Sequence, residues 1–210
     1  MGIMEMNNIK YSYEGKRNIL NNISAEFDEG KIYAILGSSG CGKTTLLSLL
    51  GGLDSPDEGA IYYRGVDIVE IGLARHRRNN ITFIFQNYNL IDYMTAAENV
   101  ALTSTKSPLA ILEQLGFTAE ETKRNVLKLS GGQQQRVAIA RALASDAKVM
   151  LADEPTGNLD EDTADEIMDI LGNCAHQMNK CVIVVTHSTD LAKKADKILH
   201  LKKGRLVDNA

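Results

Sequence analysis

The sequence predicts an α/β fold with a mixed or parallel sheet, and three observations indicate it. In the second half of the chain, helix-like segments alternate with short apolar runs, as in parallel strands joined by helices. The first 27 residues contain short β-like runs separated by turn residues, which indicates an N-terminal antiparallel β subdomain. Residues 87–129 are helix-rich and follow no Pro- or Ser-rich linker, so we expect a short helical subdomain inserted into the core.

The first half of the chain begins with two predicted paired strands, "NIKYSY" and "NISAEF", with "EGKRN" and "DEG" as turns. The apolar run "KIYAIL" (31–36) ends at a glycine and predicts a buried strand. A helix is expected to begin near Gly42. Further strands are predicted at "GAIYYRG" and at "NITFIFQ" (80–86), the latter ending at Gln86.

The second half continues with three helix-like segments, "TAAENVALT", "PLAILEQLG" and "AEETKRNVLKL", with Gly116 as a helix stop. The pattern then predicts helices at 131–144, 161–178 and 189–195, strands at 148–153 and 181–186, and a hairpin turning at Lys203-Gly204. Helical spacing assigns a core face to the 161–178 helix, made of Ala164, Ile167, Leu171, Cys174 and Met178.

Composition describes an ordinary globular chain. Its 210 residues fit a single domain, 1–210, with 87–129 as the inserted subdomain. The net charge of −4 argues against broad nucleic-acid binding, which usually shows a basic excess. No apolar run approaches the roughly 18 residues that span a bilayer. Three cysteines without a CxxC pair favour a reducing, cytosolic compartment.

A glycine-rich phosphate-binding loop, "GSSGCGKTT", lies between the 31–36 strand and the next helix. It matches G-x-x-x-x-G-K-[ST], the P-loop of nucleotide-binding proteins, so the core is predicted to be of the P-loop NTPase type. Backbone N–H groups would surround the phosphates, Lys43 would reach the β- and γ-phosphates, and the Thr44 hydroxyl would ligate Mg²⁺. The binding residues are Gly37, Ser38, Ser39, Gly40, Cys41, Gly42, Lys43, Thr44 and Thr45.

Cys41 lies at a variable position of this loop. The simpler interpretation is a small residue that fits there. The alternative is a thiol activated by the helix N-terminus, in which case thiol-modifying reagents would affect nucleotide turnover.

The apolar run "KVMLA" (148–152) is followed directly by two carboxylates, Asp153 and Glu154. In P-loop enzymes the first of such residues, Asp153, helps to hold Mg²⁺. Side chains alternate along a strand, so Glu154 is expected to point in another direction, where it could polarise an attacking water.

A second glycine-bearing turn opens a helix in "KLSGGQQQRVAIARAL" (128–143), although the chain already has a P-loop. Together with "DEPT" at 153–156, "NLD" at 158–160, "TH" at 186–187 and a glutamine at the end of a strand, this stretch resembles ABC-type ATPase domains. The resemblance extends from about Asn8 to Lys203. It implies that ATP and Mg²⁺ are the cofactors.

The resemblance also implies roles for individual residues. Tyr13 would stack on adenine, with Tyr11 as the rival, because strand alternation places both on one face. Gln86 would touch Mg²⁺ and the attacking water, and Asp160 would cross between two domains. His187 would contact the γ-phosphate and order Glu154. Catalysis would therefore involve Glu154, His187, Gln86 and Lys43, and the metal would be held by Thr44, Gln86 and Asp153.

In this family two domains pack head to tail, and each glycine-bearing signature loop covers the nucleotide of the other domain. The residues that would contact the other domain's γ-phosphate in this way are Ser130, Gly131, Gly132 and Gln133. The resemblance thus implies an ATP-dependent dimer, most simply a homodimer. Hydrolysis would loosen that dimer.

The amino-acid sequence in and around these motifs resembles that of bacterial ATPases of the macrolide- and lipoprotein-exporter type. This implies a motor subunit, cytoplasmic and peripheral on the inner face of the membrane, that drives export by a separate permease. The transported substrate would contact that permease. The alternative is a non-transporting ATPase that regulates a cell-wall or cell-division complex.

Two segments are candidates for partner contacts. The resemblance implies that "NYNLIDYM", after Gln86, borders a groove that receives a helix of the permease; the alternative is an ordinary core of the helical subdomain, and both can hold for different residues. This subdomain is shorter than is usual in the family. The charge run "RHRRNN" (75–80) is most simply a solvated loop, with contact to anionic lipid or the permease as the alternative.

Overall fold

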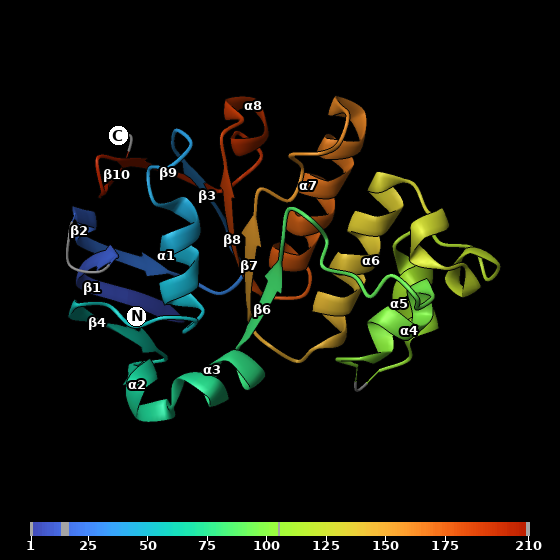
Figure 1. Ribbon diagram of the computed structural model, residues 1–210, viewed down its shortest axis with the longest axis horizontal. Helices are drawn as coiled ribbons and strands as arrows, with labels where there is room; N and C mark the ends of the chain where they lie inside the picture. Colours follow the sequence, from blue (N-terminus) through green and yellow to red (C-terminus); the bar gives the residue numbers. More distant parts are fainter. Residues whose placement is uncertain (1, 14–16, 105, 209–210) are drawn as a thin grey trace.

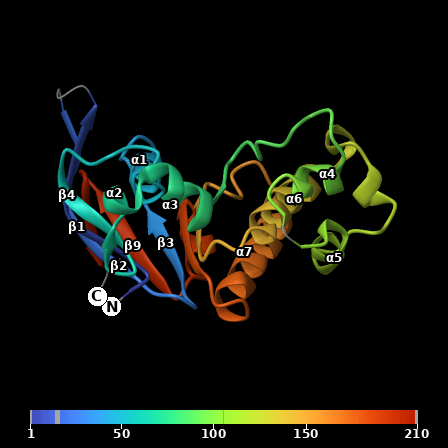
Figure 2. The ribbon, with the colours of Figure 1, turned by 90° about the horizontal axis from the view of Figure 1, so that it is seen from below.

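The computed structural model describes residues 2–13, 17–104 and 106–208. Figure 1 shows an antiparallel sheet, a largely parallel sheet and a helical lobe arranged across the molecule. Figure 2 places α4 and α5 at the opposite end from β1, β2 and β4. This arrangement confirms the predicted α/β class with an N-terminal antiparallel sheet.

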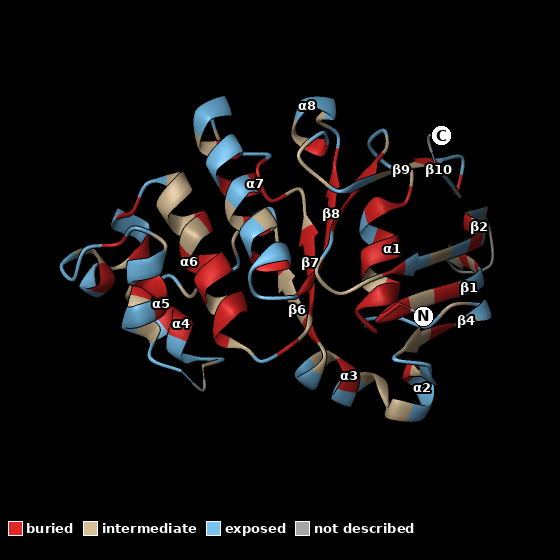
Figure 3. Cartoon of the chain, turned by 180° about the vertical axis from the view of Figure 1, so that it is seen from behind, coloured by how far each residue is buried: buried red, intermediate tan, exposed pale blue. Residues whose placement is uncertain are grey.

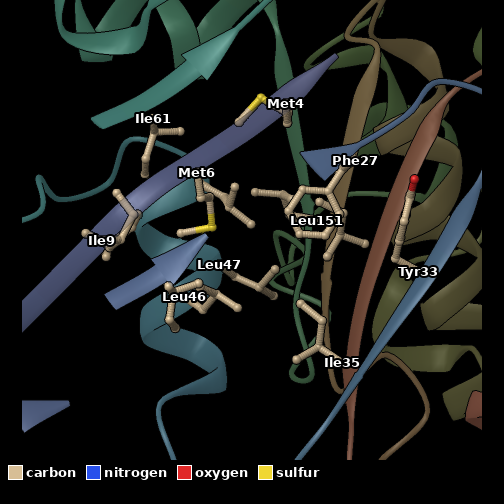
Figure 4. Packing of buried hydrophobic residues seen from close by; sticks show 14 of the residues in the cluster. Met4, Met6, Ile9, Phe27, Tyr33, Ile35, Leu46, Leu47, Ile61 and Leu151 are labelled. Atoms are coloured by element: carbon tan, nitrogen blue, oxygen red, sulfur yellow. The ribbon is translucent and has the colours of Figure 1, made fainter. Parts of the chain in front are cut away.

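The antiparallel sheet has the order β2-β1-β4-β5. Its strands are β1 (Met4–Tyr13), β2 (Arg17–Phe27), β4 (Glu58–Tyr63) and β5 (Val66–Asp67). The predicted turn at 14–18 lies mostly outside the described residues. The inner face of β1 carries the apolar residues Met4, Met6 and Ile9. They belong to the same buried cluster as Leu46 and Leu47 of the first helix (Figure 4).

The second sheet has the order β10-β9-β3-β8-β7-β6. It contains β3 (Ile32–Leu36), β6 (Ile81–Ile84), β7 (Val149–Asp153), β8 (Cys181–Thr186), β9 (Lys197–Lys202) and β10 (Arg205–Asp208). Every neighbouring pair is parallel except β9 with β10. That pair turns at Lys203 and Gly204, both at positive φ as a two-residue hairpin requires, which confirms the predicted turn.

Both faces of this sheet are covered, and its central strands β3, β7 and β8 are almost entirely apolar and buried for that reason. Val182 and Val184 of β8 pack with α6 (Gly131–Ala144) and α7 (Glu161–His176). The alternate residues, Ile183 and Val185, pack on the other side with α1 (Lys43–Leu50) and the antiparallel sheet. Figure 3 shows the resulting buried centre. The last helix, α8 (Thr189–Ala192), follows β8.

The helical lobe contains α4 (Ala96–Ala101), α5 (Pro108–Gln114) and two single 3₁₀ turns, Glu121–Lys123 and Val126–Lys128. A third helix was expected at these turns, and that expectation was wrong. Arg124 adopts an extended backbone, and the Asn125 side chain accepts a hydrogen bond from the Leu127 amide, so the helix is interrupted between them. Gly116 follows α5 at positive φ, as a helix stop should.

Three further predictions about elements need correction. Strand β6 ends at Ile84, two residues before Gln86. The charge run at 75–80 is mostly helical, because it belongs to α3 (Leu73–Asn79). This helix follows α2 (Ile68–Ile71) and precedes β6. Helix α7 ends at His176, so Met178 is 42% exposed outside it, while the other four predicted core residues of that helix are buried.

His76 of α3 is fully buried, although it lies in a run of basic residues. Its Nε2 lies 3.1 Å from the Leu50 carbonyl, which can only accept, so this nitrogen carries the proton. Its Nδ1 then accepts from the Asn80 side-chain amide at 3.2 Å. The neutral ring therefore ties α3 to the C-terminal end of α1.

Burial lowers the pKa of His76, so the unfolded chain binds this proton more readily than the folded chain. The stability that His76 contributes is complete above about pH 6.5 and is lost as the pH falls below that value. Urea unfolding at pH 7.5 and 5.5 should show a smaller loss for His76→Gln than for the unchanged chain. The variant should itself be about 1 kcal/mol less stable at pH 7.5 through repacking. Equal losses in both proteins would contradict this role.

No helix within the described ranges is long and apolar enough to cross a membrane.

Candidate functional site

The P-loop connects β3 to α1, and its backbone conformation depends on glycine. Gly40 and Gly42 have φ of 74° and 105°, in the left-handed region. A side chain on Gly42 would also approach Ile19 Cγ2 to 2.9 Å. Gly42 is the N-cap of α1, so the first backbone N–H groups of that helix face the loop.

Lys43 lies under this loop, with its side chain only 8% exposed. Its Nζ donates to the Gly37 carbonyl at 2.8 Å and lies 3.4 Å from Glu154 Oε1. The ammonium group is therefore held by loop carbonyls on one side and by a carboxylate from the end of β7 on the other.

Glu154 links three parts of the site. Its Oε2 lies 2.9 Å from His187 Nδ1, directly after β8, while its Oε1 faces Lys43. The backbone of Glu154 is left-handed, with φ of 45°, and its amide donates to the Val185 carbonyl at 3.0 Å. Such a conformation is rare for a residue with a side chain and is typical of functional sites.

This geometry corrects the prediction that strand alternation aims Glu154 away from Asp153. Strand β7 ends at Asp153, so alternation no longer applies at the next residue. Both carboxylates line the same cavity, of about 360 Å³, because the left-handed turn redirects the second.

Asp153 is half-buried beside the P-loop helix. Burial raises the pKa of Asp153, and the nearby Thr44 hydroxyl opposes that shift. Thr44, Asp153 and Gln86 line the same cavity, so their oxygens suit Mg²⁺. Within the described residues, no three or more His, Cys, Asp or Glu side chains are arranged so that they alone could hold a metal ion. A Mg²⁺ ion here would therefore need phosphate oxygens and water as further ligands.

The two tyrosines near the cavity differ in exposure. Tyr11 is 5% exposed, and its hydroxyl donates to Asp54 at 2.5 Å. Tyr13 is 55% exposed, lines the cavity and has its hydroxyl 3.1 Å from Thr45 Oγ1. Their rings meet edge to face at 5.1 Å. Only Tyr13 thus offers an open ring face beside the P-loop, as the stacking of an aromatic base requires.

The remaining lining residues come from the loops at the carboxyl edge of the sheet. Gln86 follows β6, and its carbonyl accepts from the Asn158 amide at 3.2 Å. Ser39, Gly40, Gly42 and Lys43 contribute from the P-loop. Ile19 of β2 also lines the cavity. Sequence analysis missed it, because an apolar residue between the predicted turn and the predicted strand carries no signal of ligand binding.

The second glycine loop lies elsewhere. Ser130 is the exposed N-cap of α6; its Oγ accepts from the Gln133 amide, and Gln133 Oε1 accepts from the Ser130 amide in return. None of Ser130, Gly131, Gly132 and Gln133 is among the described residues that line the P-loop cavity. The N-terminus of α6 is therefore an anion-binding shape that lies outside the P-loop cavity.

Comparison with known proteins identifies the family. A model described as "ABC transporter" matches residues 20–157. The chain is 43% identical over 215 residues to the ABC transporter ATP-binding protein YclH of Bacillus subtilis, covering 97% of this chain and 95% of that protein.

The chain belongs to the ABC transporter family.

Solved structures agree with this assignment. The dimeric ABC transporter cassette MJ0796, a protein of Methanocaldococcus jannaschii, superposes with a TM-score of 0.85 at 35% identity and covers 97% of this chain and 96% of its own. A second dimeric structure of MJ0796, in a post-hydrolysis state bound to ADP and Pi, gives a TM-score of 0.84 at 33% identity, covering 98% of each chain. CbiO1 of Clostridium perfringens, part of the complex CbiONQ, gives 0.88 at 27% identity and covers 98% of this chain and 87% of its own. The chain is accordingly an ABC ATPase.

Not every predicted site residue of this ABC ATPase lies at the cavity. Asp160 is the N-cap of α7, and its two oxygens accept from the amide and hydroxyl of Thr163 at 3.0 and 2.9 Å. The hydrogen bond from the Thr163 backbone amide lowers the pKa of Asp160. Within one chain Asp160 thus has a local helix-capping role.

Proposed function

We propose that this chain is the ATP-hydrolysing subunit of a bacterial multi-subunit ABC transporter and that it works as a head-to-tail dimer. The observation that supports this most directly is the separation of two phosphate-binding loops within one chain. The P-loop cavity contains Lys43, Asp153 and Glu154, whereas Ser130 opens a different helix. Each loop would complete a site only with the loop of a second copy.

We assign the chemistry of ATP hydrolysis to the residues around Glu154. Glu154 would orient and deprotonate the attacking water, and His187 would hold Glu154 while contacting the γ-phosphate through its free ring nitrogen. Lys43 would leave the Gly37 carbonyl to meet the β- and γ-phosphates. Bound Mg²⁺, held by Thr44 and by Asp153 and Gln86, would neutralise phosphate charge.

We assign adenine stacking to Tyr13, and the phosphate contacts to the P-loop residues from Gly37 to Thr45. In the dimer, Ser130, Gly131, Gly132 and Gln133 of one copy would donate to the γ-phosphate held by the other. Asp160 would lie at the same interface. MJ0796, which is similar over nearly the whole chain, has been solved as a dimer, which supports this arrangement.

A separate permease would complete the transporter and contact the transported molecule. Segments 92–95 and 125–127 run side by side, with Thr95 bridged to Asn125. They present Tyr93 and Leu127, 81% and 65% exposed, whereas Leu90 packs into the core. The stretch after Gln86 therefore contributes both to the core and to a surface suited to a partner. The residues of the sequence motifs support an exporter of the macrolide and lipoprotein type. In such an exporter this chain would lie peripherally on the inner face of the membrane.

Ser130→Arg tests the shared site. The bulky cation would obstruct the partner's γ-phosphate, so ATPase activity should fall by about 100-fold or more, while ATP binding to the isolated chain stays unchanged. Ser130→Ala removes the same α6 cap, at a cost of about 1 kcal/mol, and the same hydroxyl, but adds no bulk, so it should lose much less turnover than Ser130→Arg. Steady-state turnover and binding of a fluorescent ATP analogue measure the two effects. Undiminished turnover in Ser130→Arg would contradict the proposed dimer.

Co-purification from the native membrane would identify the permease.

A further inference from the structure

The end of β1 is tied to the 51–57 loop, which joins α1 to β4. The Asp57 amide donates to the Lys10 carbonyl at 2.9 Å, and Asp57 Oδ2 accepts from the amide and the hydroxyl of Ser12 at 2.7 and 2.8 Å. The last residue of β1 that pairs with β4 is Lys10. The loop therefore takes the place of β4 beside the residues that lead to Tyr13.

Tyr11 makes a further contact with this loop. Its hydroxyl donates to Asp54 Oδ2 at 2.5 Å, while Asp54 Oδ1 accepts from the Ser55 amide at 2.8 Å. The Tyr11 ring is buried in the core cluster that also contains the leucines of α1. The hydrogen bond to Asp54, together with burial, raises the pKa of Tyr11, so its hydroxyl stays protonated and remains a donor at neutral pH.

Tyr13 is in turn held by Tyr11 and by α1. The two tyrosine rings meet edge to face, with their centroids 5.1 Å apart and their planes at 87°, which is a favourable arrangement for an aromatic pair. The Tyr13 hydroxyl lies 3.1 Å from Thr45 Oγ1 in the first turn of α1. Although the Tyr13 ring is exposed, its position is therefore defined by contacts at two points.

Helix α1 connects the phosphate-binding loop to the support of Tyr13. Its N-cap is Gly42 of the P-loop. At its other end the Leu53 amide, in the 51–57 loop, donates to the Ser48 carbonyl of the last turn at 2.8 Å. The 8 residues of the helix span only about 12 Å. One short, rigid element thus fixes the P-loop at its first residues and the loop that holds the end of β1 at its last.

From these contacts we infer that Tyr11 and Asp54 form a positioning pair that holds the Tyr13 ring where the base of a bound nucleotide stacks. The inference rests on the proposed function, because it takes Tyr13 as the residue that stacks on adenine. Neither Tyr11 nor Asp54 is among the described residues that line the P-loop cavity, so both would act through Tyr13. A ring that is fixed before the nucleotide arrives loses less side-chain entropy on binding, which favours affinity.

Inorganic tripolyphosphate, which has no base, distinguishes this role from a general effect on the P-loop. Tyr11→Phe removes only the hydroxyl that Asp54 binds, and Asp54→Ala removes the carboxylate. Each variant should weaken the binding of Mg-ATP by roughly 3- to 10-fold, as for one side chain that must be ordered on binding, while the binding of Mg-tripolyphosphate stays unchanged. Calorimetric titration measures both affinities. Unchanged Mg-ATP affinity, or equal losses for the two ligands, would overturn the inference.

Tyr33→Phe is the matched control. Tyr33 is also a buried tyrosine with an aspartate partner, because its hydroxyl donates to Asp28 Oδ2 at 3.2 Å and accepts from the Asp28 amide at 2.8 Å. It lies at the start of β3 and is not among the described residues that line the cavity. Its affinity for both ligands should equal that of the unchanged chain. A loss of Mg-ATP affinity as large as that in Tyr11→Phe would contradict a specific role for Tyr11.

Two variants of the exposed Asp54 carry the test if Tyr11→Phe does not fold. Asp54→Asn keeps a polar partner for the Tyr11 hydroxyl, so it should bind Mg-ATP more tightly than Asp54→Ala. Equal affinities in these two variants would overturn the inference, because the contact with Tyr11 would then be irrelevant to binding.

A double-mutant cycle with Tyr13→Ala separates this inference from the proposed function. If Tyr11 acts through Tyr13, adding Tyr11→Phe to Tyr13→Ala should cause no further loss of Mg-ATP affinity. Multiplying losses would overturn the inference while leaving the role of Tyr13 intact. Unchanged affinity in Tyr13→Ala would instead overturn the proposed role of Tyr13, and the inference with it.

Discussion

Replacing Glu154 by glutamine should slow ATP hydrolysis by about 10²–10⁴-fold while ATP binding persists. The carboxylate that would accept a proton from water is lost, but the amide has nearly the same shape. It can still meet His187 Nδ1 and Lys43, which lie 2.9 and 3.4 Å from the carboxylate. We therefore expect an ATP-bound state that cannot proceed. Size-exclusion chromatography with ATP should show a dimer that the unchanged chain populates only transiently.

Two further variants define what this experiment shows. Glu166→Gln is a matched control, since Glu166 is an exposed carboxylate on α7 that pairs with Arg136 of α6. Its turnover should stay close to that of the unchanged chain. Adding Ser130→Arg to Glu154→Gln should abolish the ATP-dependent dimer. Near-normal turnover in Glu154→Gln would remove this residue from the assigned role.

Lys43→Ala should abolish measurable ATP binding. The ammonium would make charge-assisted hydrogen bonds to two phosphates, each worth about 1.5–3 kcal/mol, so affinity should fall by roughly 10²–10⁴-fold. The change also leaves Glu154, with a side chain only 15% exposed, facing the site without its cation. Both effects disfavour the approach of a polyphosphate. Calorimetric titration with Mg-ATP measures the loss.

Lys31→Ala serves as the control for this variant, because Lys31 is an exposed lysine that pairs locally with Asp28, on a turn before β3. It removes the same charge from the chain without touching the P-loop, so ATP affinity should be unchanged. Comparable losses of affinity in Lys31→Ala and Lys43→Ala would mean that net charge, rather than the P-loop contact, governs binding.

Local patterns sufficed to predict most elements. The β3 strand, the α6 helix, the β8 strand and the hairpin at Lys203-Gly204 were predicted closely, because apolar runs, N-cap residues and glycines act over a few neighbouring residues. Non-local contacts explain the misses. Helix α3 was interpreted as a solvated charge run because no sequence pattern shows that His76 is buried against α1.

The site shows the same division. Gln86, Asp153 and the P-loop could be placed near one another from sequence, because the carboxyl ends of parallel strands share one edge. The choice of Tyr13 over Tyr11 could not, since both lie on one face of β1 and only burial beside Asp54 separates them. The hydrogen bonds from the Arg141 side chain to the Tyr88 and Asn89 carbonyls could not be predicted either, because they join residues more than 50 positions apart.

The sequence by itself determined the chemistry: a P-loop, two carboxylates at a strand end, and a second glycine loop with its own helix. These depend on residue type and short spacing, which folding does not alter. The tertiary structure alone decided the directions of the side chains. Glu154 reaches Lys43 and His187 because its backbone turns left-handed where β7 ends, and β8 holds its amide there. Such a backbone is unfavourable in isolation, so only contacts from distant parts of the chain can maintain it.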